Sequence, residues 1–123
     1  MAVERISDAE FEVMDCLWDQ SPLTASEISE RVPADRKWSL QTVKTLLSRL
    51  VNKGAITHEV DGRRYLYRPL LERQDYVAGE SSRFVDRLFS GRAGPLFAHL
   101  AEREAFSEED IAEIERLLKE MKK

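Results

Sequence analysis

Apolar residues recur at intervals of three and four along the first part of the chain, which is the spacing of one face of an α-helix. Capping residues divide this pattern into predicted helices over residues 7–19, 24–32 and 39–53. The first two open on a Ser or Thr followed three residues later by Glu, which is the pattern of a capping box. A proline ends the second helix and Gly54 ends the third, so the sequence predicts three short helices with tight connections.

The pattern changes after the third predicted helix, where residues 55–60 and 64–68 are two short runs suited to β-strands. Asp61-Gly62 lies between them, and we expect it at the centre of a hairpin turn because both residues accept positive φ angles. Three short helices followed by a hairpin is the order of a winged helix-turn-helix domain, with the hairpin as the wing. The predicted fold class is therefore mainly α with a small β-hairpin.

The third predicted helix has an apolar face and a polar face at 100° per residue. Its apolar side is formed by Leu40, Val43, Leu46, Leu47, Leu50 and Val51. Gln41, Thr45 and Ser48 lie on the opposite side, flanked by cations. Gln can bond the edge of adenine, the Thr methyl can contact thymine, and flanking Lys or Arg can reach phosphates. An ordinary solvated helix face shows the same pattern, so this helix alone leaves both interpretations open.

The distribution of charge favours a polyanionic partner, although the net charge does not. The chain carries a formal charge of −4. Between Arg36 and Arg68, however, eight basic and two acidic residues give a net charge of +6, and the acidic excess lies elsewhere. A basic field confined to one part of an acidic protein can direct DNA to a single face.

The predicted wing carries Arg63 and Arg64 just past its tip, where strand alternation sends them to opposite sides. One of them can enter the minor groove or follow the DNA backbone. In a lone hairpin the same arginines would be solvated charges that discourage aggregation. After a helix of this type, they favour DNA contact by at least one arginine. Trp38, beside the third helix, either packs under it or rests against a sugar-phosphate strand.

Pro69 marks the predicted boundary between a DNA-binding domain over residues 1–69 and a helical dimerisation domain over residues 70–123. Helices are expected over residues 71–89 and 95–103, and a last one begins after Ser107.

The last predicted helix carries an apolar stripe that the winged domain, which has its own core, cannot bury. Packing against the preceding helices and against a second chain would bury it, and two-fold dimers are the commonest oligomers. Such a dimer matches two DNA half-sites roughly 34–36 Å apart. The apolar residues expected at the dimer interface are Phe84, Leu88, Leu96, Leu100, Ile111, Ile114, Leu117, Leu118 and Met121.

Several motifs of the first 69 residues resemble the penicillinase-repressor family, of the BlaI and MecI type. They include Leu17-Trp18, Thr42-Val43-Lys44-Thr45-Leu46-Leu47, Lys53-Gly54 and Gly62-Arg63-Arg64-Tyr65-Leu66-Tyr67-Arg68-Pro69. The resemblance implies a homodimer that represses β-lactamase or penicillin-binding-protein genes by occupying palindromic operators. It also implies that a membrane sensor, acting indirectly, triggers cleavage of the repressor when a β-lactam is present.

Two departures limit what the resemblance implies. The family's cleavage point is an Asn-Phe bond in the short helix before the last one, and the pair aligned with it here is His99-Leu100. Cleavage at this bond is therefore an open expectation. A copper-responsive branch of the family carries a C-terminal cysteine cluster, which this chain lacks, so copper sensing through that cluster is excluded.

Other function classes find little support in the sequence. Cys16, His58 and His99 are scattered, without the spacing of a metal site or a catalytic constellation, so we expect no enzyme activity, no metal and no cofactor. Cys16 is expected to act as a small buried hydrophobe. We expect no membrane span and no secretory signal, and a single cysteine fits the reducing cytoplasm.

The sequence thus predicts a cytoplasmic, homodimeric repressor that binds double-stranded operator DNA. A winged helix that serves only as a protein-interaction module is the alternative. The residues expected to contact DNA are polar or basic: Lys37, Ser39, Gln41, Thr42, Lys44, Thr45, Ser48, Arg49, Arg63 and Arg64.

Overall fold

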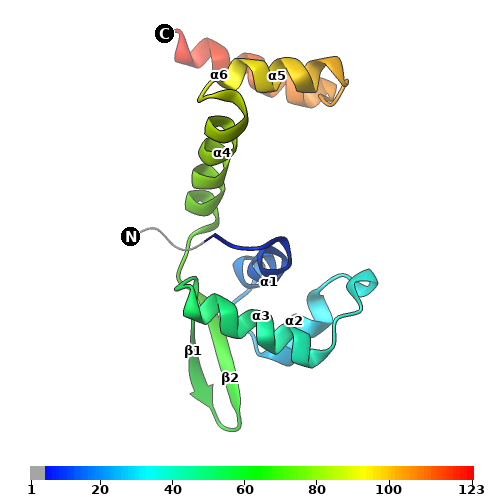
Figure 1. Cartoon of the computed structure of the whole chain (residues 1–123), viewed down its shortest axis with the longest axis vertical. Coiled ribbons are helices and arrows are strands. Elements are labelled where there is room, and N and C mark those ends of the chain that lie inside the picture. Colours follow the sequence, from blue (N-terminus) through cyan, green and yellow to red (C-terminus); the bar gives the residue numbers. More distant parts are fainter. Residues whose placement is uncertain (1–4) are drawn as a thin grey trace. The chain divides into compact units, whose positions relative to one another are not determined.

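The computed structural model describes residues 5–123. The chain divides into two compact units, Met1–Tyr76 and Val77–Lys123. The first unit contains three helices and a hairpin, and the second contains most of one long helix and two shorter ones (Figure 1). The described part is therefore mainly helical with one small antiparallel sheet, as the sequence predicts.

The helices of the first unit begin and end close to where the capping residues place them. They are α1 (Asp8–Asp19), α2 (Ala25–Arg31) and α3 (Leu40–Asn52), with a short 3₁₀ helix, η1 (Ala34–Arg36), before α3. Both predicted capping boxes are present: the Ser7 and Thr24 hydroxyls accept from a backbone N–H three residues on, and the Glu there accepts from the cap's own N–H. Ser39 caps α3 in the expected way, because its hydroxyl accepts from the Thr42 N–H.

The hairpin consists of β1 (Ile56–Asp61) and β2 (Arg64–Pro69), which pair antiparallel. The prediction that Asp61-Gly62 forms the centre of the turn is wrong, because Asp61 is paired with Arg64 and the two central residues are Gly62 and Arg63. Gly62 has a φ of +66°, which suits the first central position of a type II′ turn. Arg63 therefore lies at the tip of the hairpin.

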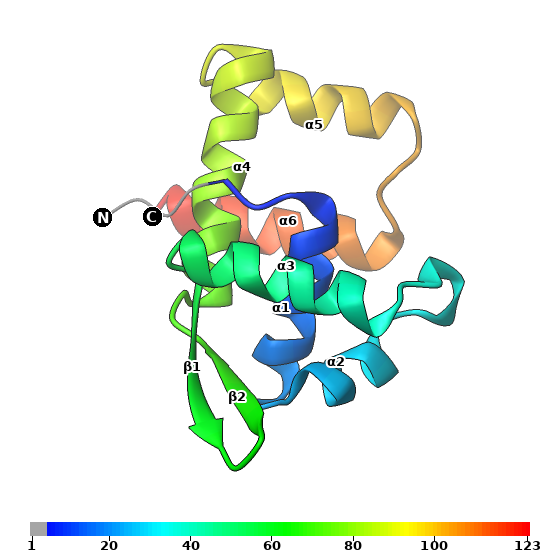
Figure 2. The ribbon, with the colours of Figure 1, turned by 60° about the horizontal axis from the view of Figure 1, so that its bottom comes forward.

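The core of the first unit lies where the apolar faces of the three helices meet the base of the hairpin (Figure 2). Two backbone hydrogen bonds between Leu23 and Tyr67, of 3.2 and 2.8 Å, join the hairpin to the segment before α2. Trp38 is half-buried and packs against this core, so the packing alternative for Trp38 is confirmed. Leu40, predicted on the apolar side of α3, is 40% exposed because it is the first residue of the helix, at the margin of the core. The largest fully buried side chains are Met14, Leu17, Leu23, Ile28, Leu47, Leu50 and Ile56.

The first turn of α4 (Arg73–Phe89) belongs to this first unit. The indole N–H of Trp18 donates to the Leu71 carbonyl over 2.7 Å, and the rings of Phe11, Trp18 and Tyr76 pack together at centroid distances of 5.6–6.3 Å. These contacts hold the segment after Pro69 against α1. The compact unit consequently extends to Tyr76, seven residues past the boundary that Pro69 suggests.

The second unit consists of the rest of α4, α5 (Ala93–Glu102) and α6 (Glu108–Met121). Ser107 caps α6 as predicted, and α5 begins two residues before the expected Pro95, which lies within its first turn. None of the described side chains in these three helices is buried. No helix within residues 5–123 has both the length and the apolarity needed to cross a membrane.

Candidate nucleic-acid interface

The outer face of α3 carries the polar side chains that the sequence assigns to base recognition. Gln41, Thr45 and Ser48 are all exposed, while Val43, Leu46, Leu47 and Leu50 hold the opposite face in the core. The Thr45 hydroxyl donates to the Gln41 carbonyl over 3.0 Å, so its polar group is satisfied within the helix. The Thr45 methyl group is therefore free for apolar contact. The side-chain amide of Gln41 has no hydrogen-bond partner among the described residues.

The eight basic residues between Arg36 and Arg68 fall into two equal groups. Four of them form ion pairs within the chain: Arg36 with Glu12, Lys53 with Glu10, Arg64 with Asp61, and Arg68 with Glu59. Within the described residues, the other four have no carboxylate partner: Lys37, Lys44, Arg49 and Arg63. The basic field that the sequence shows is thus half neutralised internally, and its unpaired half flanks the polar face of α3 and occupies the wing tip.

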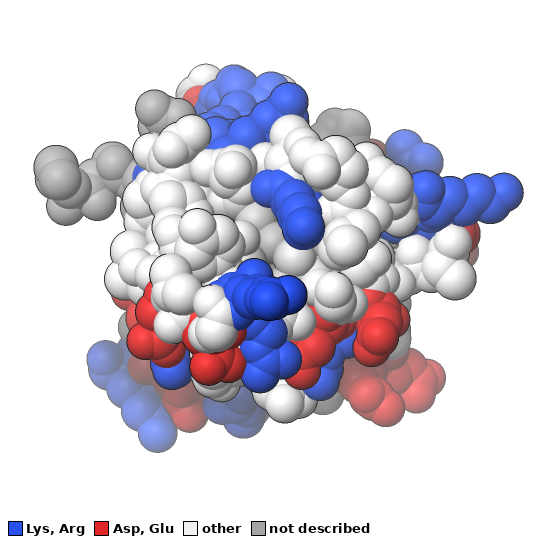
Figure 3. Space-filling model, turned by 90° about the horizontal axis from the view of Figure 1, so that it is seen from below, with Lys and Arg blue, Asp and Glu red and all other residues white. Residues whose placement is uncertain are grey.

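Figure 3 views the molecule from the hairpin end. Most of this surface is uncharged, with separate Lys and Arg side chains projecting from it, and the carboxylates gather along one margin. A surface with unpaired cations around uncharged polar groups suits a duplex, whose phosphates border the base edges.

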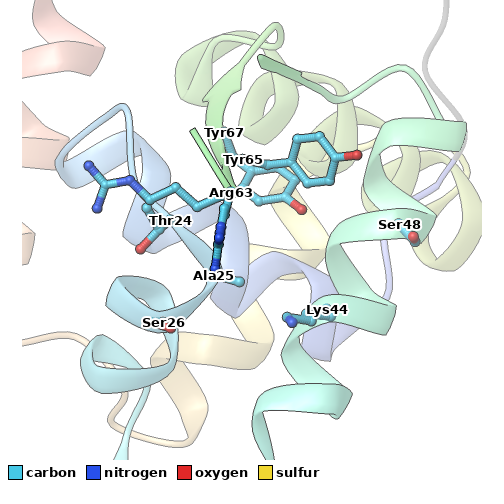
Figure 4. Close-up of a pocket in the computed structure, with 9 residues that line it drawn as sticks. Thr24, Ala25, Ser26, Lys44, Ser48, Arg63, Tyr65 and Tyr67 are labelled. Atoms are coloured by element: carbon cyan, nitrogen blue, oxygen red, sulfur yellow. The ribbon is translucent and has the colours of Figure 1, made fainter. Parts of the chain in front are cut away.

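A cleft of about 460 Å³ lies between the start of α2, the outer side of α3 and the hairpin (Figure 4). Five residues in its wall are not among those that the sequence assigns to DNA contact: Thr24, Ala25, Ser26, Tyr65 and Tyr67. Strand alternation could have indicated the tyrosines, because it places Tyr65 and Tyr67 on the face of β2 that also reaches the core. No feature of the sequence around Ser26 indicates that this residue lines the cleft. The cleft is lined by Thr24, Ala25, Ser26, Lys44, Ser48, Arg63, Arg64, Tyr65 and Tyr67.

The two arginines of the wing differ in their surroundings. The guanidinium of Arg64 donates to the Asp61 carboxylate over 3.0 and 3.1 Å, which ties it to the preceding strand. Arg63, at the tip, has no ion pair in the described part of the chain. Arg63 is therefore the wing arginine whose charge is available to a partner without breaking an internal contact.

A buried ion pair holds the end of α3 against the start of α1. The Glu10 carboxylate is 1% exposed and accepts from Lys53 Nζ over 2.6 Å, while Lys53 Nζ also donates to the Arg5 carbonyl over 2.8 Å. Burial raises the pKa of Glu10, but hydrogen bonds from Lys53 and Ser7 more than offset this and hold that pKa below its usual range. The outer face of α3 thus belongs to a helix that is anchored at its C-terminal end.

Cys16 is half-buried in a second hollow, beside Glu12, Asp15 and Asp19. Burial raises the pKa of its thiol. The described residues contain no group of three or more His, Cys, Asp or Glu side chains arranged to hold a metal ion. Cys16 itself packs against the core of the first unit.

The residues predicted for dimerisation lie on the helices of the second unit. Six of them are at least 41% exposed: Phe84, Leu88, Ile111, Leu117, Leu118 and Met121. Leu96, Leu100 and Ile114 are half-buried. His99, exposed in α5, lies 6.2 Å from Phe89 between ring centroids, so the His99-Leu100 bond is inside a helix.

The fold and this face define a winged helix-turn-helix protein. The sequence pattern of the penicillinase repressor family matches residues 6–120, and the chain belongs to that family. It is 33% identical to the penicillinase repressor of Bacillus licheniformis over 120 residues, which are 98% of this chain and 94% of the relative. It is also 33% identical to the methicillin resistance regulatory protein MecI of Mammaliicoccus sciuri over 113 residues, 92% of each chain.

A solved structure connects the fold to DNA. The solution structure of the monomeric form of B. licheniformis BlaI in complex with the blaP half-operator is 37% identical, with a TM-score of 0.52. The match covers 61% of this chain and 92% of that one. Family membership supports the prediction of a regulator rather than an enzyme.

Proposed function

We propose that this chain is a cytoplasmic, homodimeric transcriptional repressor that binds palindromic operators. Its targets would be resistance genes of the β-lactamase or penicillin-binding-protein type, as the names of its relatives suggest. The observation that carries the proposal is the outer face of α3, where exposed Gln41, Thr45 and Ser48 lie among unpaired cations.

In this proposal α3 enters the major groove. Gln41 bonds an adenine edge and the Thr45 methyl contacts thymine, while Lys44 and Arg49 bind phosphates that fix the register. Lys37, Ser39, Thr42 and Ser48 border the same face, and the wing contacts the backbone beside it. The complex of the BlaI relative with a half-operator supports this arrangement.

The second unit would join two chains. Its helices expose seven large apolar side chains and bury none of the described ones, an arrangement that leaves apolar surface in water. A second copy would cover these faces, and it would bring a second winged unit to the other half of a palindrome.

A mobility-shift and footprinting experiment on the DNA around its own gene tests the function. A duplex protected over two inverted half-sites, at protein concentrations where mixed-sequence DNA is free, is the expected result. Failure to bind any duplex at low salt would contradict the proposal and favour a winged helix that binds only a protein partner.

Repression would end when the chain is cut in its second unit, on a signal from a membrane sensor pathway. A cut at His99-Leu100 would remove α6 and its apolar stripe, and the two winged units would lose their linkage. Since this bond lies within α5, cleavage requires that the helix first opens locally. Mass spectrometry of the intact chain from β-lactam-treated cells tests this: a full-length repressor while target genes switch on would contradict it.

A further inference from the structure

The cleft between α2, α3 and the wing has a position and a chemistry that the base-reading role of α3 does not use. Lys44 and Ser48 line it from α3, Ser26 lines it from α2, and Arg63 and Tyr65 line it from the hairpin (Figure 4). Its walls thus come from three separate elements of the first unit, which fixes them relative to one another through the shared core.

The charge of the cleft suits one anionic group. Lys44 and Arg63 enter it from different elements, and neither has an ion pair among the described residues. Arg64 also lines the cleft, but the Asp61 carboxylate already holds it. The hydroxyls of Ser26 and Ser48 add uncharged donors beside the two cations, which is a donor set for a phosphate.

The hairpin side of the cleft is aromatic. The rings of Tyr65 and Tyr67 extend from β2 toward α3, and the Tyr65 side chain is 49% exposed (Figure 4). Behind it, the His58 ring lies 4.7 Å away between centroids in an edge-on contact. His58 therefore supports the Tyr65 ring at the cleft wall. An exposed aromatic surface next to two unpaired cations suits a sugar ring attached to a phosphate.

We propose that this cleft holds one sugar–phosphate unit of the DNA backbone, with the phosphate between Lys44 and Arg63 and the deoxyribose against Tyr65. This rests on the proposed function, since the occupant is the strand that borders the groove bound by α3. The contact has two separable parts. The phosphate part weakens as salt rises, because counterions compete for it. The Tyr65 part does not weaken in this way, because contact between uncharged groups releases no counterions.

The test measures binding of the full chain to a short duplex of mixed sequence over a series of salt concentrations. Tyr65→Thr, which removes the ring but keeps a residue suited to a strand, should weaken binding about tenfold at every salt concentration with an unchanged salt slope. Tyr65→Phe, which keeps the ring, should bind like the unmodified chain. The double variant Lys44→Ala/Arg63→Ala, which removes both cations from the one phosphate, should reduce the slope by about 0.9.

Arg68→Ala is the matched control for charge removal on the wing. Arg68 is paired with Glu59 and lies on the opposite face of β2 from Tyr65, so its loss should leave the slope nearly unchanged. Circular dichroism melts of each variant confirm that the hairpin is folded.

Each failure has its own signature. The sugar contact is wrong if the unmodified chain binds the duplex and Tyr65→Thr binds it equally well. It is also wrong if the affinity lost in Tyr65→Thr grows as the salt concentration falls. If the double variant Lys44→Ala/Arg63→Ala keeps the full slope, the phosphate contact is wrong. A chain that binds no duplex at any salt concentration would overturn the proposed function as well.

Discussion

The two units of this chain differ in how completely they bury their apolar residues. The winged unit encloses a core of fully buried side chains, closed by the Leu23–Tyr67 bridge and by the ion pair of Glu10 with Lys53. The helices of the second unit expose Leu117, Leu118 and Met121 at 44%, 47% and 79%. The first unit therefore buries its apolar residues within one chain, whereas the second leaves apolar surface exposed, as is typical of a face that contacts another protein.

The largest expected effect is on the stability of the winged unit. Leu47→Ala removes a fully buried side chain of α3 and should lower the free energy of unfolding by about 2–5 kcal/mol. Leu117→Ala, on an exposed face, is the matched change in the second unit. Its effect should be small in dilute protein and should grow with protein concentration, because the proposed dimerisation would be linked to folding. Denaturant unfolding at two concentrations checks both variants, and equal losses at both sites would erase the distinction between the units.

The next largest effect concerns the proposed dimerisation of two chains. Leu117→Asp places a charge in the proposed apolar interface and should yield monomers. Operator affinity should then fall by about 10²-fold, since each half-site is bound without help from the other. Sedimentation gives the mass and a mobility shift gives the affinity. Leu117→Met, which keeps an apolar side chain, is the control, and a Leu117→Asp variant that is still dimeric would rule out this interface.

A smaller effect separates base recognition from backbone contact within the winged unit. Gln41→Ala or Thr45→Ala should cost about 1–3 kcal/mol on the operator and little on mixed-sequence DNA. Lys44→Ala should weaken both to a similar extent. Parallel titrations of the two DNAs provide the measurement. Equal losses on both DNAs for all three variants would show that another face reads the bases.

The smallest effect is a dependence on pH within the winged unit. Because the folded pKa of Glu10 lies below its usual value of about 4.5, the stability it contributes is fully present above that value. This contribution is lost as the pH falls through the lowered pKa. Glu10→Gln keeps a capping side chain but removes the charge, so its free energy of unfolding should fall less steeply on acidification. Identical acid profiles for the two proteins would show that the ion pair with Lys53 does not contribute.

Local chemistry explains which features of the fold the sequence predicts. Ser7, Thr24, Ser39 and Ser107 cap their helices as expected, because capping depends on residues only three positions apart. The sequence misplaces the centre of the hairpin turn by one residue. Asp61-Gly62 and Gly62-Arg63 both suit a two-residue turn, and the pairing of the strands decides between them.

The candidate site was predicted less completely, because its decisive contacts join distant parts of the chain. The sequence shows a net charge of +6 between Arg36 and Arg68, but it does not show which of these cations form ion pairs within the chain. Arg36 pairs with Glu12 and Lys53 with Glu10, both across long sequence separations. The same holds for the cleft, where Ser26 and Tyr65 meet only because α2 and the hairpin pack on one core.

The most direct test of the account is the salt dependence of DNA binding by the unmodified chain. The four unpaired cations of each winged unit would contact three phosphates, because Lys44 and Arg63 share one. The logarithm of affinity should therefore fall with the logarithm of salt concentration with a slope of about −2.7 per winged unit. Isothermal measurements on a duplex containing a single half-site give this slope. A value near that figure supports DNA recognition by α3 and the wing tip, and an affinity that does not change with salt would contradict it.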